Sequence, residues 1–273
     1  MSTTQDILVV KLGGSAGNDI AAFCNDVAEF VRAGRRLVVV HGGSDWTNRL
    51  SEQLGAPPEF ITSPSGHTSR RTDRRTLEIM QMACRGGLNQ AVVEKLQAAG
   101  VNAIGLSGMD GRTWVGERKE AVRSVENGRT RIIRDDFTGT VEDVNVELLR
   151  TLLGAGYTPV LCPPGLSRGN EPINVDADRA AARTAAAIGA SELLLLSNVA
   201  GLMRAFPDES TLIPRIQRGA IDEAMGFAEG RMKKKVLGAG EALEGGVTRV
   251  VIGDARSERP IAAALAGKGT VFE

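Results

Sequence analysis

The first fifty residues contain one pattern twice, an apolar run that ends in two adjacent glycines. Residues 7–14 read ILVVKLGG and residues 36–43 read RLVVVHGG. Each run has the length and aliphatic content of a buried strand, and a glycine pair commonly ends a strand in a tight turn. Helical spacing of apolar residues follows each run, over about 18–33 and 45–54. The repeated succession of strand, glycine turn and helix predicts an α/β fold with a mainly parallel sheet covered by helices.

The rest of the chain continues this alternation. The further elements that the pattern predicts are a helix over 73–99 that bends at its glycine pair, β-hairpins over 112–143, and helices over 177–188 and 233–245. A loop rich in proline and glycine, 163–172, separates the two parts of the chain. We therefore expect one architecture with two lobes, residues 1–165 and 166–273, and not two independently folding domains.

Composition excludes several classes of protein. The chain has 33 basic and 33 acidic residues, so its net charge argues against general nucleic-acid binding. Its three cysteines are scattered and form no C-x-x-C pair, which indicates neither a metal site nor a disulfide framework. A signal peptide and an apolar stretch long enough to cross a bilayer are both absent from the sequence. We therefore expect a cytoplasmic protein that binds neither membranes nor nucleic acid.

The glycine pairs and a lysine indicate an anion site. The sequence has no Walker-type G-x-x-x-x-G-K-[ST] motif and no G-x-G-x-x-G after a strand. Lys11 instead lies at the end of the first strand, beside Gly13 and Gly14, and Gly42 and Gly43 end the second strand. Bare glycines let backbone N–H groups approach an anion, and ligands bind at the carboxyl ends of parallel strands. These residues are therefore expected to bind phosphate.

Two later segments supply partners for Lys11. In INVDADRAAA, Asp176 is expected to cap a helix, whereas Asp178 near the helix start is expected to hold lysines in place. The segment EGRMKKKV places Lys233, Lys234 and Lys235 at the start of another helix. Consecutive residues on a helix point in different directions, so at most one or two of these lysines face a site. Cations at a helix N-terminus oppose the helix dipole, and an ATP phosphate would offset that cost.

Five motifs in this order resemble the amino acid kinase family: K-L-G-G, H-G-G, N-V-x-A-D, L-S-N-V-x-G-L and G-x-M-x-x-K. The resemblance covers essentially the whole chain and is strongest to acetylglutamate kinases. It implies a three-layer αβα sandwich, with an N-lobe that binds the amino-acid acceptor and a C-lobe that binds MgATP. It also implies transfer of phosphate to a side-chain carboxylate, with the metal held mainly by the nucleotide.

The resemblance also implies roles for individual residues. Lys11 and Lys235 would contact the transferring phosphate, and Asp178 would organise both. A carboxylate with a pKa of about 4 is ionised at neutral pH, so its attack needs no general base. His41 and His67 therefore need no catalytic role. The remaining assignments are Gly13 and Gly14 as N–H donors to phosphate, Gly42, Gly43, Arg70 and Asn174 for the acceptor, and Ser197, Val199 and Gly201 for the nucleotide.

Departures from the acetylglutamate kinase pattern indicate a particular branch of the family. The segment GHTSRRTDRR is two residues longer before Arg70 and adds arginines after it, and Asn198 replaces an acid. With EGRMKKKV and IRDD, these features resemble kinases of lysine biosynthesis that act on α-aminoadipate linked to a small acidic carrier protein, LysW. The added cations Arg71, Arg74 and Arg75 would then dock the carrier, with Arg131 and Arg134 as further candidates; otherwise they form a solvated face.

Alternatives remain open from the sequence. The chain could instead be an N-acetylglutamate kinase of arginine biosynthesis, a kinase of carrier-linked glutamate, or a nucleotide-binding regulator without catalysis. One methylene separates aminoadipate from glutamate, and no single residue in the sequence reports that difference. Because the first strand begins near residue 7, we expect a homodimer joined through the helix around 77–99, and no arginine inhibition.

Overall fold

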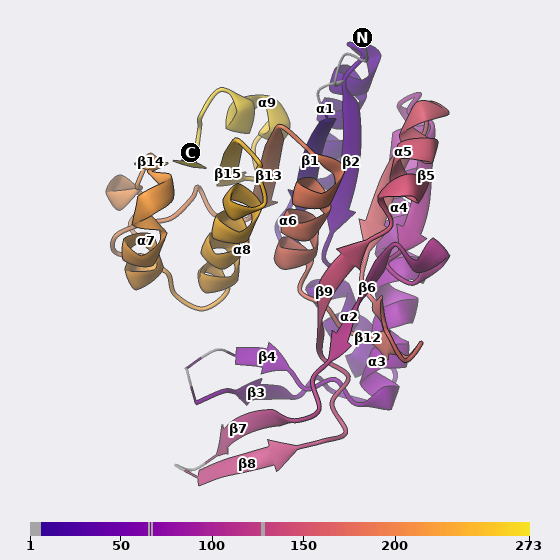
Figure 1. Cartoon of the computed structure of the whole chain (residues 1–273), viewed down its shortest axis with the longest axis vertical. Coiled ribbons are helices and arrows are strands. Elements are labelled where there is room, and N and C mark those ends of the chain that lie inside the picture. Colours follow the sequence, from indigo (N-terminus) through magenta and orange to yellow (C-terminus); the bar gives the residue numbers. More distant parts are fainter. Residues whose placement is uncertain (1–6, 65, 67, 127–128) are drawn as a thin grey trace.

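The computed structural model describes residues 7–64, 66, 68–126 and 129–273, and its centre is an eight-stranded sheet (Figure 1). Six adjacent strands are parallel, whereas β16 runs antiparallel to β15, and β14 pairs parallel with β16. This confirms the mainly parallel sheet. In spatial order the strands are β14 (Arg215–Ile216), β16 (Thr270–Phe272), β15 (Arg249–Asp254), β13 (Glu192–Ser197), β1 (Ile7–Leu12), β2 (Arg36–His41), β10 (Thr158–Cys162) and β5 (Ala103–Ser107).

Helices cover both faces of this sheet, so the predicted three-layer αβα sandwich is confirmed. Side chains alternate along each strand, and in β1 Val9 joins the core of one face while Val10 joins the core of the other. One face carries α1 (Ile20–Arg32), α4 (Gln90–Ala98) and α9 (Pro260–Leu265). The opposite face carries α5 (Val146–Gly154), α6 (Ala177–Ile188) and α8 (Met232–Glu244), with α7 (Ile221–Phe227) packed on α8.

Smaller β-structures lie beyond the carboxyl ends of the parallel strands (Figure 1). A four-stranded sheet and two hairpins form there, and β3 of one hairpin contacts β7 of the other. The hairpins expected over 112–143 are therefore confirmed, and the expected loop 163–172 contains the paired strands β11 and β12. The strands are β12 (Pro172–Ile173), β11 (Gly165–Ser167), β6 (Trp114–Arg118) and β9 (Gly139–Val144) in the small sheet, and β3 (Phe60–Thr62) with β4 (Thr68–Arg70) and β7 (Val122–Glu126) with β8 (Arg129–Ile133) in the hairpins.

The long helix expected over 73–99 forms, but it does not simply bend at its glycines. It consists of α3 (Arg74–Gln81), a π-helical segment (Met82–Asn89) and α4. Asp73 caps its start by accepting a hydrogen bond from the Thr76 amide, 2.8 Å. Gly87 lies within the widened segment, where an added Cβ would be 2.8 Å from the Trp46 ring of α2 (Ser44–Gln53). Absence of a side chain there lets the two helices approach closely.

The two expected lobes share the central sheet. Residues before 165 contribute β1, β2, β5 and β10, whereas β13 to β16 come from the later part, and β1 pairs with β13 at the junction. The expected boundary coincides with the start of β11. Short 3₁₀ turns occur at Asp110–Arg112, Glu209–Thr211 and Arg218–Ala220. Within the described part of the chain, every helix is too short or too polar to span a bilayer.

Candidate active site

A buried carboxylate between two lysines lies at the carboxyl edge of the sheet. Lys11 comes from β1, Asp178 is the second residue of α6, and Lys235 lies in the first turn of α8. The Nζ atoms of Lys11 and Lys235 lie 2.6 and 2.7 Å from the two different carboxylate oxygens of Asp178. All three side chains are less than 10% exposed. The structure therefore brings together three residues that are separated by up to 224 positions in the chain.

Electrostatics favour the charged form of Asp178 in this arrangement. Burial opposes the charge of Asp178, but the two ammonium groups outweigh it and hold the pKa of Asp178 well below its usual range. Burial also lowers the pKa of Lys11, and the Asp178 carboxylate offsets part of that effect. The three side chains carry one net positive charge in a poorly solvated place. An incoming phosphate would compensate that charge.

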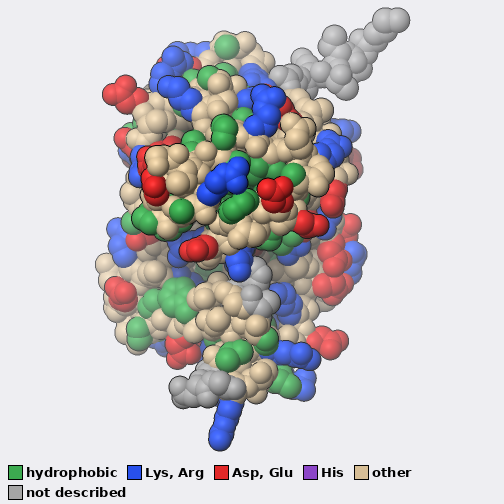
Figure 2. Space-filling model, turned by 90° about the vertical axis from the view of Figure 1, so that its left-hand side faces the viewer, with side chains coloured by type: hydrophobic (Ala, Val, Ile, Leu, Met, Phe, Trp, Pro, Cys, Tyr) green, Lys and Arg blue, Asp and Glu red, His purple; other side chains and the backbone are tan. Residues whose placement is uncertain are grey.

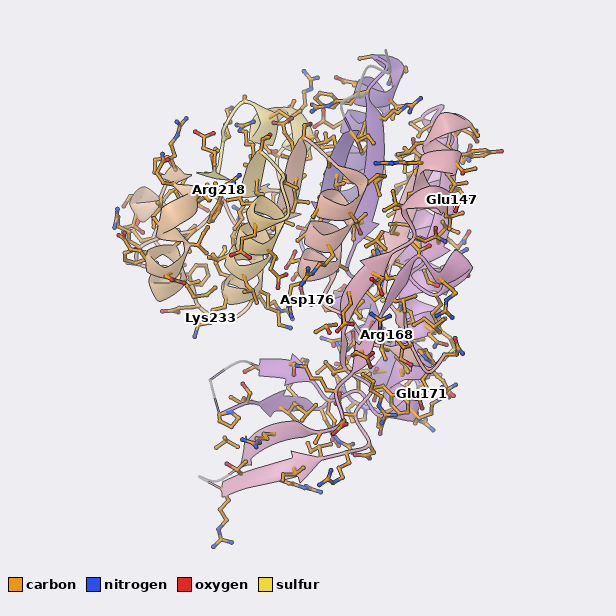
Figure 3. The ribbon with its side chains drawn as sticks, viewed as in Figure 1. Glu147, Arg168, Glu171, Asp176, Arg218 and Lys233 are labelled. Atoms are coloured by element: carbon orange, nitrogen blue, oxygen red, sulfur yellow. The ribbon has the colours of Figure 1, made fainter. Side chains whose placement is uncertain are left out.

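Helical phase separates the three consecutive lysines at the start of α8, as the sequence predicts. Lys235 points inward to Asp178, whereas Lys234 lies 3.2 Å from Asp176. Asp176 also caps α6 through the amides of Asp178 and Arg179, at 3.0 and 3.1 Å, so its expected capping role is confirmed. Lys233 lies at the lower end of α8, on the side that faces the hairpins (Figure 3). Of the three lysines, Lys235 is the one that contacts the buried carboxylate.

The two glycine pairs pack against each other, which explains why both positions lack side chains. A Cβ on Gly14 would lie 2.3 Å from the Gly43 nitrogen. The Gly13 amide donates to the Leu196 carbonyl at 2.8 Å, and the Gly42 amide donates to the Leu12 carbonyl at 3.1 Å. No hydrogen bond joins the amides of Gly14 and Gly43 to another described residue. Of the four predicted N–H donors, these two remain available to an anion.

Arg70 lies at the end of β4, across the gap from the lysines. Its Nη2 donates to the Ser44 carbonyl at 3.2 Å and to Oδ1 of Asn48, and its guanidinium lies 5.3 Å from the Phe60 ring centre. Its Nη1 is buried and lacks a hydrogen-bond partner in the described part of the chain. Buried donors without partners are rare in native proteins. A ligand carboxylate at Nη1 would satisfy this one.

Asn174, the second predicted acceptor residue, belongs to a hydrogen-bonded row of three segments. Its Nδ2 donates to Thr72 Oγ1 at 2.8 Å, and its backbone amide donates to the Phe137 carbonyl at 2.8 Å. The carboxylate of Asp136 is buried and accepts from the amides of Thr72 and Thr138, both at 2.8 Å. Asp136 thus joins the segment between Arg70 and α3 to residues 136–138, to which Asn174 is also hydrogen-bonded.

The predicted nucleotide residues follow β13. Ser197 ends this strand, and its buried Oγ lacks a hydrogen-bond partner among the described residues. Val199 is half-buried, and Gly201 packs so tightly that an added Cβ would be 2.7 Å from Leu212. Between Ser197 and Val199, the side-chain amide of Asn198 donates to the carbonyl of Ala16 in the loop after β1, at 3.3 Å. An amide at position 198 can make this bond, whereas a carboxylate has no hydrogen to donate.

The arginine cluster that follows Arg70 divides in the structure. Arg71 pairs with three carboxylates, of which Asp135 is nearest at 2.8 Å. Arg74 pairs with Glu78 one helical turn later, at 2.8 Å, while Arg75 donates to a backbone carbonyl at 3.1 Å. Much of the positive charge expected from the sequence is therefore neutralised within the chain.

His41 has a structural role, as expected. It is fully buried, its Nδ1 donates to the Gly42 carbonyl at 2.7 Å, and its Nε2 accepts from Asn89 at 2.9 Å. Burial lowers the pKa of His41 to about 4, so the ring is neutral at pH 7. His67 lies outside the described residues.

Three polar residues of the site were not assigned roles from the sequence. Asn48 belongs to no motif in the sequence and is distinguished only by its position one turn into α2. Asp136 lies within IRDD, and Arg231 lies within the G-x-M-x-x-K motif, so both belong to segments that the family comparison had marked. Arg231 Nη1 donates to Ser15 Oγ at 2.6 Å, although 216 residues separate them.

A gap opens between the C-terminal elements and the hairpins. The space-filling view shows a hollow along this seam, with basic side chains visible beside it (Figure 2). The site thus combines buried cations, two free amides and an open side.

Comparisons with known proteins agree with this geometry. The profile of the amino acid kinase family matches residues 6–254. A [LysW]-aminoadipate kinase of Deinococcus radiodurans is 59% identical over 266 residues, covering 97% of this chain and 91% of that protein. A [LysW]-aminoadipate kinase of Thermus thermophilus is 53% identical over 267 residues, covering 97% of this chain and 99% of that protein. A putative [LysW]-aminoadipate/[LysW]-glutamate kinase of Nitrosopumilus maritimus is 36% identical over 260 residues, covering 95% and 96%.

The fold is also found among solved structures. The crystal structure of smu.665 from Streptococcus mutans superposes with a TM-score of 0.77 at 22% identity, covering 98% of this chain and 99% of that one. The family profile spans the residues that form the lysine–aspartate–lysine cluster and both glycine pairs. The chain therefore belongs to the amino acid kinase family.

Proposed function

We propose that this protein is an ATP-dependent kinase that phosphorylates the side-chain carboxylate of L-2-aminoadipate while the aminoadipate is linked to the carrier protein LysW, in lysine biosynthesis. The observation that carries the proposal is the buried cluster of Lys11, Asp178 and Lys235, which suits transfer of a phosphoryl group between two anions. The 59% identity to a kinase of this name supports the choice of substrate.

The residues supply alignment and charge neutralisation. The acceptor carboxylate is already ionised near neutral pH and attacks the γ-phosphorus without a base. Lys11 and Lys235 neutralise charge on the transferring oxygens, while Asp178 holds both ammonium groups in place. The free amides of Gly14 and Gly43 add hydrogen bonds from backbone that cannot move far. The products are an acyl phosphate and ADP.

ATP and its metal enter from the β13 side in this proposal. Ser197, Val199 and Gly201 line the nucleotide site, near Gly13 and the loop after β1. Magnesium supplies charge neutralisation on the triphosphate. The site carboxylate, Asp178, is engaged by two lysines. We therefore assign the metal to the nucleotide and to no protein cage.

The acceptor lies on the hairpin side, in the N-lobe, and its α-carboxylate binds Arg70 Nη1. Asn174 contacts the same substrate through its carbonyl oxygen, since its amide nitrogen is bonded to Thr72. The acidic carrier docks on basic residues at the start of α3, where Arg75 has no carboxylate partner among the described residues. Arg71 and Arg74 contribute less, because carboxylates of the chain already pair with them.

The exposed Met82 on the π-helical segment, 51% exposed, fits an interface between two copies of the chain. We propose a cytoplasmic homodimer joined through α3 and α4. Light scattering on the purified protein tests this, and a hexamer would contradict it.

A second candidate activity is phosphorylation of LysW-linked glutamate, which would place the protein in arginine biosynthesis as well. The name of the Nitrosopumilus maritimus relative favours this candidate. Free N-acetylglutamate is a third acceptor to compare. A catalytically silent nucleotide-binding regulator is the alternative from another class.

One assay separates these alternatives. The protein is incubated with ATP, Mg²⁺ and hydroxylamine, which traps acyl phosphate as a hydroxamate, and with each of the three acceptors. We expect turnover with LysW-aminoadipate and little with N-acetylglutamate. Raising the ionic strength from about 0.05 M to about 0.5 M should lower kcat/KM for the carrier-linked acceptor several-fold, because it screens docking charges. Preference for free N-acetylglutamate would contradict the proposal of a carrier-linked substrate. Absence of turnover with every acceptor would favour the alternative of a nucleotide-binding regulator.

A further inference from the structure

Arg231 reaches from one side of the site to the other. It immediately precedes α8, four residues before Lys235, and its Nη1 donates to Ser15 Oγ at 2.6 Å. Ser15 directly follows Gly13 and Gly14, so the guanidinium lies over the loop whose Gly14 amide is available to an anion. An arginine on α8 therefore contacts the anion-binding turn of β1.

The charge of Arg231 is not neutralised within the described part of the chain. Its partner is the hydroxyl group of Ser15, whereas exposed arginines elsewhere, such as Arg168 and Arg256, pair with carboxylates at 3.2 Å or less. Arg231 is also close to Arg70. Burial lowers the pKa of Arg70, and the charge of Arg231 adds to that lowering. Two neighbouring guanidinium groups without an anion between them repel each other.

The surroundings of Arg231 thus lack an anion. The buried ammonium groups of Lys11 and Lys235 share the carboxylate of Asp178, whereas Arg231 contacts the hydroxyl group of Ser15. The Arg70 Nη1 donor is buried and has no partner in the described part of the chain. A ligand that brings a carboxylate to Arg70 and a phosphoryl group to Lys11 would pass beside Arg231.

We propose that Arg231 is a further catalytic residue, which leaves Ser15 when substrates bind and donates to an oxygen of the phosphoryl group in transfer. The proposal rests on the phosphoryl transfer proposed above. In that step an acceptor carboxylate oxygen forms a bond to the γ-phosphorus, and the bond from this phosphorus to the ADP oxygen breaks. ADP leaves with the electron pair, and no proton moves. Arg231 neutralises the phosphoryl oxygens from the open side, opposite the buried lysines.

The rival explanation is that Arg231 only tethers the loop after β1. Ser15 distinguishes the two roles, because Ser15→Ala removes the tether and leaves the guanidinium in place. Arg231→Gln removes the charge, and Arg231→Lys keeps the charge but not the planar donor fork. Arg215→Gln on the outer strand β14, which removes the ion pair of Arg215 with Glu273, is the matched control for loss of a surface arginine.

The variants are compared with the unmodified chain in steady-state kinetics, using whichever acceptor that chain phosphorylates. For Arg231→Gln we expect kcat to fall by about 10²-fold or more, as when one donor to developing charge is removed, with each KM changed less than about threefold. The kcat of Arg231→Lys should lie between those of Arg231→Gln and the unmodified chain. Guanidinium ion added to Arg231→Gln should restore part of kcat. Ser15→Ala and Arg215→Gln should stay within about threefold of the unmodified kcat.

A binding measurement makes the test independent of turnover. ADP with aluminium fluoride imitates the phosphoryl group in transfer, so calorimetry should show weaker binding of this pair to Arg231→Gln, with ADP alone unchanged. Ser15→Ala reproducing the kinetic loss would overturn the proposal in favour of a tether. Equal aluminium fluoride binding in all variants would overturn it as well. If no acceptor is phosphorylated, the proposed function fails, while the binding comparison still decides the role of Arg231.

Discussion

Replacing Asp178 with asparagine tests how the site cluster affects stability. The change keeps the shape of the side chain and removes its charge, leaving Lys11 and Lys235 facing each other in a place where both are less than 10% exposed. Each ammonium now lies within 2.7 Å of a carboxylate oxygen, and neither would retain an anionic partner there. Repulsion between the two ammonium groups and the cost of burying them without a carboxylate then both destabilise the folded chain.

The expected cost is about 3–5 kcal/mol of unfolding free energy, the usual effect of removing one partner from a buried ion pair. Its dependence on pH has a definite sign. Burial already lowers the pKa of Lys11 from 10.5, and loss of Asp178 removes the interaction that raised it. In the variant the unfolded chain therefore binds more protons than the folded chain, so its stability rises with pH up to about 10.5.

Urea unfolding followed by circular dichroism, at pH 7 and pH 9.5, measures both quantities. The deficit of Asp178→Asn relative to the unmodified chain should be about 3–5 kcal/mol at pH 7 and smaller at pH 9.5. A triple variant, Lys11→Met with Asp178→Leu and Lys235→Met, should recover most of the stability and remain inactive, because apolar side chains can replace a buried ion pair. A deficit below about 1 kcal/mol, or one that grows with pH, would refute this reasoning.

Two further predictions concern residues around the cluster. Burial lowers the pKa of His41 from 6.5 to about 4 in the folded chain, so its neutral form stabilises the fold above pH 6.5 and this contribution is lost as the pH falls toward 4. An NMR titration should show one imidazole still neutral at pH 5.5. Titration of both histidines near 6.5 would contradict this prediction. Gly14→Ala should abolish activity, since its Cβ would lie 2.3 Å from the Gly43 backbone nitrogen, whereas Gly86→Ala, with open space around the added carbon, should keep full activity in the same kinase assay.

Local patterns were sufficient for most of the fold. The strands at residues 7–12 and 36–41, and the helix at 177–188, follow from runs and spacings of apolar residues, because burial on a sheet or helix imposes those periods. The position of the candidate site at the carboxyl edge of the sheet also follows from the order of strands and helices, since parallel strands bring their carboxyl ends together. The π-helical segment within 73–99 was not predicted, because it depends on contact between Gly87 and another helix.

The candidate site was predictable where a motif names the residue. Lys11 stands alone in its segment, and Asp178 was separated from Asp176 by its place after the expected helix cap, so the sequence was enough to select both. Lys235 is one of three consecutive lysines, and a family motif rather than composition distinguished it. Arg231 stands at a variable position of the same motif, and its contact with Ser15, 216 residues earlier, is visible only in the structure.

The sequence by itself determined the order of elements, the glycine turns, the helix caps and which charged residues the chain possesses. The tertiary structure decided which of those charges remain available. Arg71 is neutralised by Asp135, 64 residues away, whereas Arg70 keeps a buried donor without a partner. The physical reason is that a charge interacts over a few ångströms of space and not along the chain, so partners follow from packing. The arginine cluster therefore contains Arg70, whose buried donor has no partner among the described residues, beside Arg71 and Arg74, which carboxylates of the chain neutralise.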